Sequence, residues 1–172
     1  MAIHMKSKLL QLLKNKTAHI LFLLFVLAFV WHSGFKTYYN YGESMEPTLK
    51  SHQLIVVNKI WYDLVPLARY DVVVINVDDD ECYTKRVIAL PNEVIEIKNG
   101  RIFVNEKERA DDPIENPWHW YNSKTGVGNR GIKFPKTLLK ANECFYIGDN
   151  RDETVWGIAS MKDIRGKVMM LK

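Results

Sequence analysis

Two side chains in this 172-residue sequence could together catalyse acyl transfer, a serine and a lysine. Ser44 lies in a loop-like segment in which Gly42 permits close backbone approach and Pro47 stiffens the chain just after the hydroxyl. Lys85 lies in a strand-like run whose later residues, 87–90 (VIAL), are apolar. On alternation alone, a lysine that faces outward is the favoured interpretation. If Lys85 faces inward, desolvation lowers its pKa, and a neutral amine beside a serine hydroxyl is a competent general base.

Other catalytic chemistries have little support in the sequence. The five histidines are scattered, and neither H-x-x-x-H nor C-x-x-C spacing, which zinc sites favour, occurs. A Ser-His-Asp triad would have to use His52 or His119, and His119 stands between two tryptophans, where a stacked surface or core role is favoured. The glycines form no phosphate-binding motif. We therefore expect neither a metal nor an organic cofactor.

The elements that must position these residues begin with an apolar segment near the N-terminus. Residues 20–31 (ILFLLFVLAFVW) are all apolar, and no charge falls between Lys16 and Lys36. As a helix, this uncharged stretch covers about 28 Å, close to the hydrocarbon thickness of a bilayer. A core helix would show a polar face, and a cleavable signal would need small residues where Trp31 and His32 stand. The segment predicts an uncleaved transmembrane helix over residues 17–35.

The charge distribution predicts the orientation of this helix. Four lysines in residues 1–16 precede every acidic residue, and they account for the whole formal net charge of +4. Such a basic arm favours a cytoplasmic N-terminus and places residues 36–172 on the outer side of the cell membrane. Those residues are neutral overall, so charge arithmetic favours no nucleic-acid or phosphate-binding surface. An oxidising compartment would permit a disulfide between Cys82 and Cys144, although two buried free thiols are an equal alternative.

Residues 36–172 read as a β-rich domain. Short runs rich in β-branched residues predict strands at 54–58, 72–77, 83–90, 94–97, 102–104 and 144–147. Asn99-Gly100 predicts a hairpin, and residues 161–165 predict one helical turn. Residues 106–141 are rich in proline and glycine and predict a loop-rich insertion or small subdomain. The expected fold is mostly β: one N-terminal transmembrane helix, then a β-rich catalytic domain with this insertion.

Three short motifs resemble those of one enzyme family. Residues 44–49 (SMEPTL) resemble the S-M-x-P-T-L box of type I signal peptidases, and residues 85–91 (KRVIALP) resemble their K-R-V-x-x-x-P box. Residues 148–151 (GDNR), with 156–157 (WG) downstream, resemble their G-D-N-R…W-G box. The boxes occur in the family's order after a single N-terminal anchor, and together they are far more specific than any one alone.

The resemblance implies a membrane-bound serine endopeptidase that removes signal peptides from exported preproteins, without a cofactor. It implies Ser44 as nucleophile and Lys85 as general base, with Asp149 and Arg151 of the last box in support. The partners would be preproteins and membrane lipid.

The sequence also departs from the family pattern at several positions. The last box is about four positions shorter than usual, and Thr154 stands where the family has the serine that orients the lysine. We therefore expect the Thr154 hydroxyl within about 3.5 Å of the Lys85 amine. Gly42 stands where some members have an oxyanion serine, and it would leave room for the oxyanion. Met45 and Tyr83 would line the pocket for small substrate residues, with ordinary core packing as the alternative.

Three rival functions remain open at this point. A processing peptidase dedicated to a conjugation or secretion system would use the same chemistry on fewer substrates. A mitochondrial inner-membrane peptidase has similar boxes, although no long amphipathic presequence is present. A membrane-tethered β-domain that has lost catalysis would only bind peptides. Cleavage of a preprotein with and without Ser44→Ala separates these classes.

Overall fold

The computed structural model describes residues 2–59, 64–78, 81–98, 101–109, 133–151 and 153–169, with side chains described from residue 15 onward. The chain divides into two compact units, Met1–Phe35 and Lys36–Lys172. We call the second unit the body. The predicted insertion falls mainly on residues 110–132, including His119, which lie outside the described residues.

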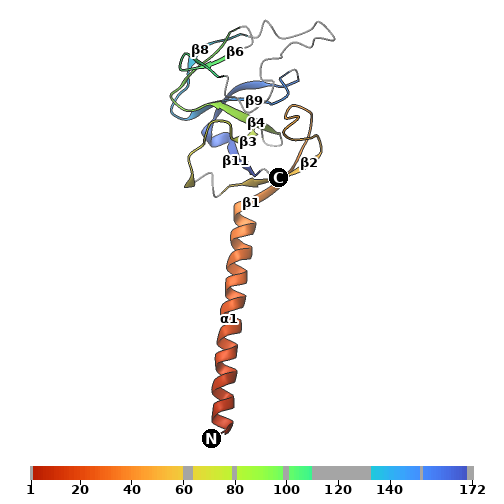
Figure 1. Cartoon of the computed structure of the whole chain (residues 1–172), viewed down its shortest axis with the longest axis vertical. Coiled ribbons are helices and arrows are strands. Elements are labelled where there is room, and N and C mark those ends of the chain that lie inside the picture. The colour runs from red at the N-terminus through yellow and green to blue at the C-terminus, as the bar shows by residue number, and fades with distance from the viewer. Residues whose placement is uncertain are drawn as a thin grey trace. The chain divides into compact units, whose positions relative to one another are not determined.

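The first unit is a single helix, α1 (Ala2–Gly34) (Figure 1). Its part from Asn15 to Gly34 is long and apolar enough to cross a membrane, with a mean hydropathy of 1.7. Large apolar side chains are exposed between Ile20 and Trp31, among them Leu21 and Phe22 at 66% and 68%. A helix that is apolar on every side has no solvent-facing stripe, so its surface matches lipid better than water. The predicted transmembrane span of 17–35 overlaps this apolar segment, and membrane crossing itself stays a prediction.

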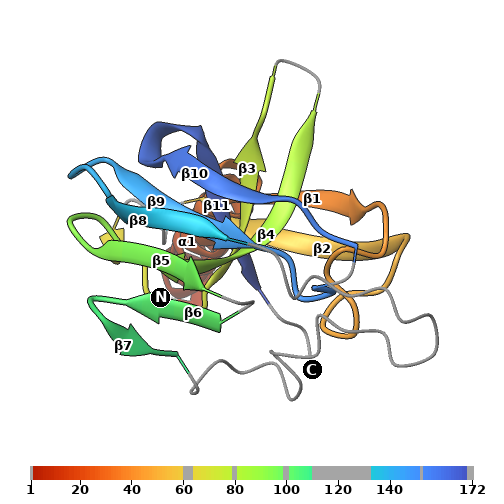
Figure 2. The same cartoon turned by 90° about the horizontal axis from the view of Figure 1, so that it is seen from above.

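The body consists almost entirely of β-structure (Figure 2). A seven-stranded sheet has the strand order β1-β2-β11-β3-β4-β9-β10, and a four-stranded sheet has the order β7-β6-β5-β8. The larger sheet contains β1 (Phe35–Asn40), β2 (Gln53–Asn58), β3 (Val72–Asn76), β4 (Cys82–Ala89), β9 (Glu143–Ile147), β10 (Trp156–Ser160) and β11 (Ile164–Met169). The smaller contains β5 (Val94–Lys98), β6 (Arg101–Val104), β7 (Lys107–Glu108) and β8 (Phe134–Leu138). The mostly β fold with one N-terminal helix is therefore confirmed.

The long apolar runs form central strands because both faces of the larger sheet are covered. In β3, Val72 and Val74 join one buried cluster, whereas Val73 and Ile75 join another. Side chains alternate between the two faces of a strand, so a continuous apolar run fits a strand that is buried on both sides. A third cluster packs residues of β4 and β9 against β5 and β6 and so joins the two sheets.

The predicted strands agree with β2, β3, β4, β5, β6 and β9 to within one or two residues at each end. The hairpin is confirmed by the antiparallel pairing of Lys98 with Arg101 on either side of the predicted turn. The predicted helical turn is present as η1 (Met161–Asp163), but β11 begins directly after it. The pattern missed β1, β7, β8, β10 and β11, which carry polar residues, glycine or Pro135 in place of an apolar run.

Candidate active site

Ser44 lies in the loop between β1 and β2, and apolar side chains hold this loop in place. Met45 and Leu49 are 0% and 2% exposed and pack in the cluster formed by β2, β3 and β11. The Leu49 N–H donates to the Met45 carbonyl, which closes a turn between the two buried residues. Gly42 adopts φ +82°, a conformation that glycine tolerates best. The loop thus buries its apolar side chains and leaves Ser44 half-buried.

Lys85 lies in the middle of β4 and reaches Ser44, which lies in a loop between two other strands of the same sheet. Lys85 is only 4% exposed, and its Nζ donates a hydrogen bond of 2.6 Å to Ser44 Oγ. The outward-facing lysine that alternation favours is therefore wrong. Tertiary packing decides the direction of this side chain, because β4 is covered on both faces and the residues after Lys85 are buried as well.

Burial changes the acid–base chemistry of this lysine. Desolvation lowers the pKa of Lys85 from its ordinary value of 10.5 to about 8, and the Asp149 carboxylate opposes part of that shift. Removal from water penalises the charged ammonium more than the neutral amine. A substantial fraction of Lys85 is consequently neutral at mildly alkaline pH, while it contacts a hydroxyl whose proton it could accept.

A buried ion pair joins β4 to the turn that follows β9. The Arg86 guanidinium donates to both carboxylate oxygens of Asp149, at 2.7 Å and 2.5 Å. It also donates to the Tyr70 carbonyl and to the Thr48 hydroxyl of the Ser44 loop. This two-point geometry is the strong form of an arginine–carboxylate pair. Through these hydrogen bonds, Arg86 connects β4 to the loop that carries Ser44 and to the turn that carries Asp149.

The turn after β9 also touches the nucleophile loop through the backbone. The Asn150 N–H donates to the Ser44 carbonyl at 3.0 Å. At Gly148 an added Cβ would collide with the Ser44 carbonyl and the Thr154 hydroxyl, so only glycine allows this close approach. Arg151 is 5% exposed in the same turn. Asp149 and Arg151, predicted as supporting residues, are thus both buried in this turn, and the Asp149 charge acts on Lys85.

Thr154 does not make the hydrogen bond predicted for it. Its hydroxyl accepts the Gly148 N–H and donates to the Val155 carbonyl, both at 3.0 Å. Within the described residues, the side-chain hydrogen bond of Lys85 is the one to Ser44. The shortened box brings Thr154 back onto Gly148, so the hydroxyl stabilises its own turn. The sequence offset matched the family's orienting serine, but in this chain the hydroxyl bonds to Gly148 and Val155.

A cavity of about 230 Å³ opens beside the serine and lysine, and its wall contains one of the two predicted pocket residues. Tyr83 lines it, with its ring centroid 5.5 Å from Lys85 Nζ. Met45 does not, because it is fully buried in the core, as the alternative interpretation held. The residues around the cavity are Asn40, Tyr41, Ser44, Cys82, Tyr83, Thr84, Lys85, Glu153 and Val155. Sequence reasoning gave no site role to Arg86, although it stands directly after Lys85 in the second box.

The cysteines and His52 were the remaining candidates for a disulfide, a metal site or a catalytic base. Cys82 and Cys144 are free thiols that belong to different core clusters, so the disulfide is not formed. Burial raises the pKa of the Cys144 thiol to about 12. His52 packs edge-on against Tyr41 and lies 3.1 Å from the Ser51 hydroxyl. Within the described ranges, no group of three or more histidine, cysteine or acidic residues is arranged to hold a metal.

Comparison with known proteins shows extended similarity along the chain. The family described as "Signal peptidase, peptidase S26" matches residues 13–171. A signal peptidase I of Bacillus caldolyticus is 37% identical over 144 residues, which cover 78% of this chain and 77% of that protein. A signal peptidase IB of Staphylococcus aureus is 34% identical over 160 residues, covering 84% and 81%. A solved signal peptidase I from Enterococcus faecalis superimposes on 60% of this chain and 97% of its own, with 17% identity and a TM-score of 0.47.

Proposed function

The chain belongs to the signal peptidase family, peptidase S26, and we propose that it cleaves signal peptides from exported preproteins with Ser44 as nucleophile and Lys85 as general base. It is a signal peptidase I-type protease. One observation supports the catalytic assignment above all: a buried lysine with a pKa near 8 donates a 2.6 Å hydrogen bond to a half-buried serine hydroxyl.

The proposed reaction begins with neutral Lys85. Its Nζ accepts the proton of the Ser44 hydroxyl as Oγ attacks the scissile carbonyl and forms an acyl-enzyme. The same amine, now protonated, gives its proton to the departing amine of the mature protein. Lysine then takes a proton from water, which hydrolyses the acyl-enzyme. The chemistry needs no metal and no organic cofactor.

The oxyanion of the tetrahedral intermediate requires hydrogen-bond donors beside Ser44. The Ser44 N–H is the expected donor, and within the described residues it makes no hydrogen bond to the protein. Position 42 is open, because a Cβ there would meet no protein atom within 4 Å. Gly42 is therefore needed chiefly for its backbone conformation. A single donor of this type typically contributes about 10²–10³ in rate.

The substrate would bind as an extended peptide, because extended chains can pair with unpaired backbone groups at a strand edge. The cavity wall combines the Tyr83 ring with the Val155 side chain next to Ser44. A small, partly apolar recess of this kind suits the small residues that flank a signal-peptide cleavage point. Tyr83 is our candidate for recognising them.

The apolar part of α1 would anchor the enzyme in the cell membrane, with the N-terminus in the cytoplasm and the body on the outer side. Support comes from the span of 20 residues from Asn15 to Gly34 and from the four lysines of residues 1–16, three before this span and one at its start. Ser44 follows the span by only ten residues. A cleavage site just beyond a signal peptide's own apolar segment would emerge at a similar depth.

The decisive experiment is cleavage of a purified preprotein by the full chain in detergent, with products identified by mass. Ser44→Ala and Lys85→Arg should each lower the rate at least about 10³-fold, since one removes the nucleophile and the other keeps a cation that cannot act as a base. Ser51→Ala and Lys98→Arg are matched controls outside the cavity and should cleave normally. Wild-type-like turnover by Ser44→Ala would disprove the assignment.

A panel of preproteins in the same assay separates the general enzyme from a dedicated one. Cleavage of several unrelated preproteins, each after a small residue, is the result expected here. Cleavage of one substrate alone would instead indicate a processing peptidase of a single secretion or conjugation system. Binding of preproteins without cleavage would indicate a β-domain that has lost catalysis.

A further inference from the structure

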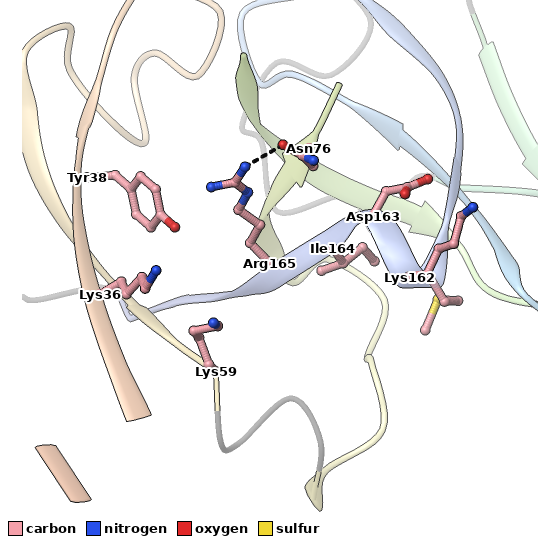
Figure 3. Close-up of a pocket in the computed structure, with 9 residues that line it drawn as sticks. Lys36, Tyr38, Lys59, Asn76, Lys162, Asp163, Ile164 and Arg165 are labelled. Carbon is pink, nitrogen blue, oxygen red and sulfur yellow. Dashed lines mark hydrogen bonds between the residues drawn. The ribbon is translucent and has the colours of Figure 1, made fainter. Parts of the chain in front are cut away.

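The body contains a second and larger cavity, of about 490 Å³, that shares no lining residue with the first. It lies where β1, the end of β2, the end of β3 and the start of β11 come together (Figure 3). Its lining residues are Lys36, Tyr38, Lys59, Asn76, Met161, Lys162, Asp163, Ile164 and Arg165. Its volume lies in the range of small-ligand sites, so it can accept a group the size of a phosphate with a short polar substituent.

The lining carries a marked excess of positive charge. Three lysines, Lys36, Lys59 and Lys162, and one arginine, Arg165, face a single carboxylate, that of Asp163. Within the described part of the chain, none of these four cations has a carboxylate within ion-pair distance. Other cations of the body do, for example Lys140 with Glu143. The body is neutral overall, yet its described residues include a local cluster of four cations that share one carboxylate and form no ion pair.

Hydrogen bonding holds the arginine of this cluster in position. Arg165 Nη2 donates to Asn76 Oδ1 at 2.6 Å, and Figure 3 shows the guanidinium extended from β11 between Asn76 and the ring of Tyr38. Lys36 and Tyr38 are two apart on β1, so their side chains leave the same face of the strand. A guanidinium held by a hydrogen bond, together with lysine ammonium groups and a phenolic hydroxyl, is a donor set suited to phosphate oxygens.

We propose that this cavity binds the phosphate group of an anionic membrane phospholipid. The inference that the phosphate belongs to a lipid rests on the membrane anchoring proposed above. Lys36 is only two residues beyond Gly34, where the apolar helix ends. A residue at that position belongs to the headgroup layer if α1 spans the bilayer, and basic residues at the membrane surface attract anionic lipids. The enzyme would thereby be held at the headgroups by its body as well as by its helix.

The test measures lipid binding by the full chain in neutral detergent, with native mass spectrometry counting bound phosphatidylglycerol and phosphatidylcholine. Lys59→Gln/Lys162→Gln should weaken phosphatidylglycerol binding at least about tenfold and leave the weaker phosphatidylcholine binding unchanged. Lys36 is kept, because a charge next to the apolar helix also affects insertion. The matched control is Lys107→Gln/Lys133→Gln, which removes one exposed lysine of β7 and one directly before β8.

If both double variants weakened phosphatidylglycerol binding equally, overall charge would explain the effect, and the proposal would be overturned. Competition by inorganic phosphate or glycerol phosphate at the concentration at which phosphatidylglycerol binds would also overturn the lipid source, because it would indicate a site for free phosphate. Lys59→Arg/Lys162→Arg should restore binding if charge in the cavity is the cause. Since lipid binding is read without substrate and in a Ser44→Ala background as well, failure of the proposed catalysis cannot imitate either result.

Discussion

At the scale of the residue, Lys85 should set the pH dependence of cleavage. Only its neutral form can accept the Ser44 proton, and its pKa is lowered to about 8 by burial. The rate should therefore rise with pH, pass half-maximum near pH 8 and level off above it. Initial rates measured from pH 6 to pH 10 on one preprotein would check this. A rate that follows a group near pH 6.5 and is lost in His52→Gln would contradict the lysine base.

The same residue should affect stability. The pKa of Lys85 is about 8 when folded and 10.5 in its ordinary state, so between these values the unfolded chain binds more protons. The free energy of unfolding should consequently rise as pH increases from 8 to 10.5, by up to about 3 kcal/mol. Lys85→Met lacks this contribution, and urea unfolding of both proteins at several pH values isolates the difference. Parallel pH curves would show that Lys85 keeps its ordinary pKa.

At the scale of the element, the turn between β9 and β10 depends on the Thr154 hydroxyl. Thr154→Val removes the acceptor for the Gly148 N–H, and an unsatisfied, part-buried donor typically costs about 1–3 kcal/mol. We expect Thr154→Val to lower the free energy of unfolding by that amount and Thr154→Ser to be tolerated. Chemical denaturation measures both. If Thr154→Val were fully stable yet slow to cleave, the hydroxyl would orient Lys85, as its place in the sequence first indicated.

The ion pair between β4 and the Asp149 turn has two measurable consequences. Asp149→Asn leaves Arg86 buried without a carboxylate, which should destabilise the fold by about 3–5 kcal/mol. It also removes the negative charge that raises the pKa of Lys85, so the half-maximum of the rate should move to lower pH. Glu143→Gln, which changes a surface carboxylate paired with Lys140, should leave that half-maximum in place. A shift toward higher pH in Asp149→Asn would contradict the electrostatic account.

At the scale of the whole molecule, the basic N-terminal arm and the body should lie on opposite sides of the membrane that α1 crosses. The full chain should resist extraction by alkaline carbonate, because a mainly apolar segment of 20 residues would be buried in lipid. Protease added to sealed inside-out vesicles should leave the body intact, since the basic arm keeps the N-terminus in the cytoplasm. Digestion of the body in such vesicles would contradict the proposed orientation. Release of the chain by carbonate would contradict the proposed membrane anchor.

Much of this molecule follows from the sequence for reasons that are local in the chain. The apolar helix, the strands with β-branched runs and the Asn99-Gly100 hairpin rest on periodicity and turn chemistry, which neighbouring residues determine. Ser44 and Lys85 were identified by short motifs. Polar strands such as β1 and β11 were missed, because a strand that gains its hydrogen bonds from distant partners needs no apolar alternation of its own.

Tertiary structure alone decided what depends on contacts between distant segments. Lys85 and Ser44 are 41 positions apart, and only the packing of the β1–β2 loop against β4 turns the lysine inward and lowers its pKa. The same dependence placed Met45 in the core, directed the Thr154 hydroxyl to Gly148 and left the two cysteines apart. It also gathered cations into one cavity of a neutral body. Net charge and residue spacing can be read along the chain. Burial and electrostatic interactions depend on distances in space, which only the folded structure defines.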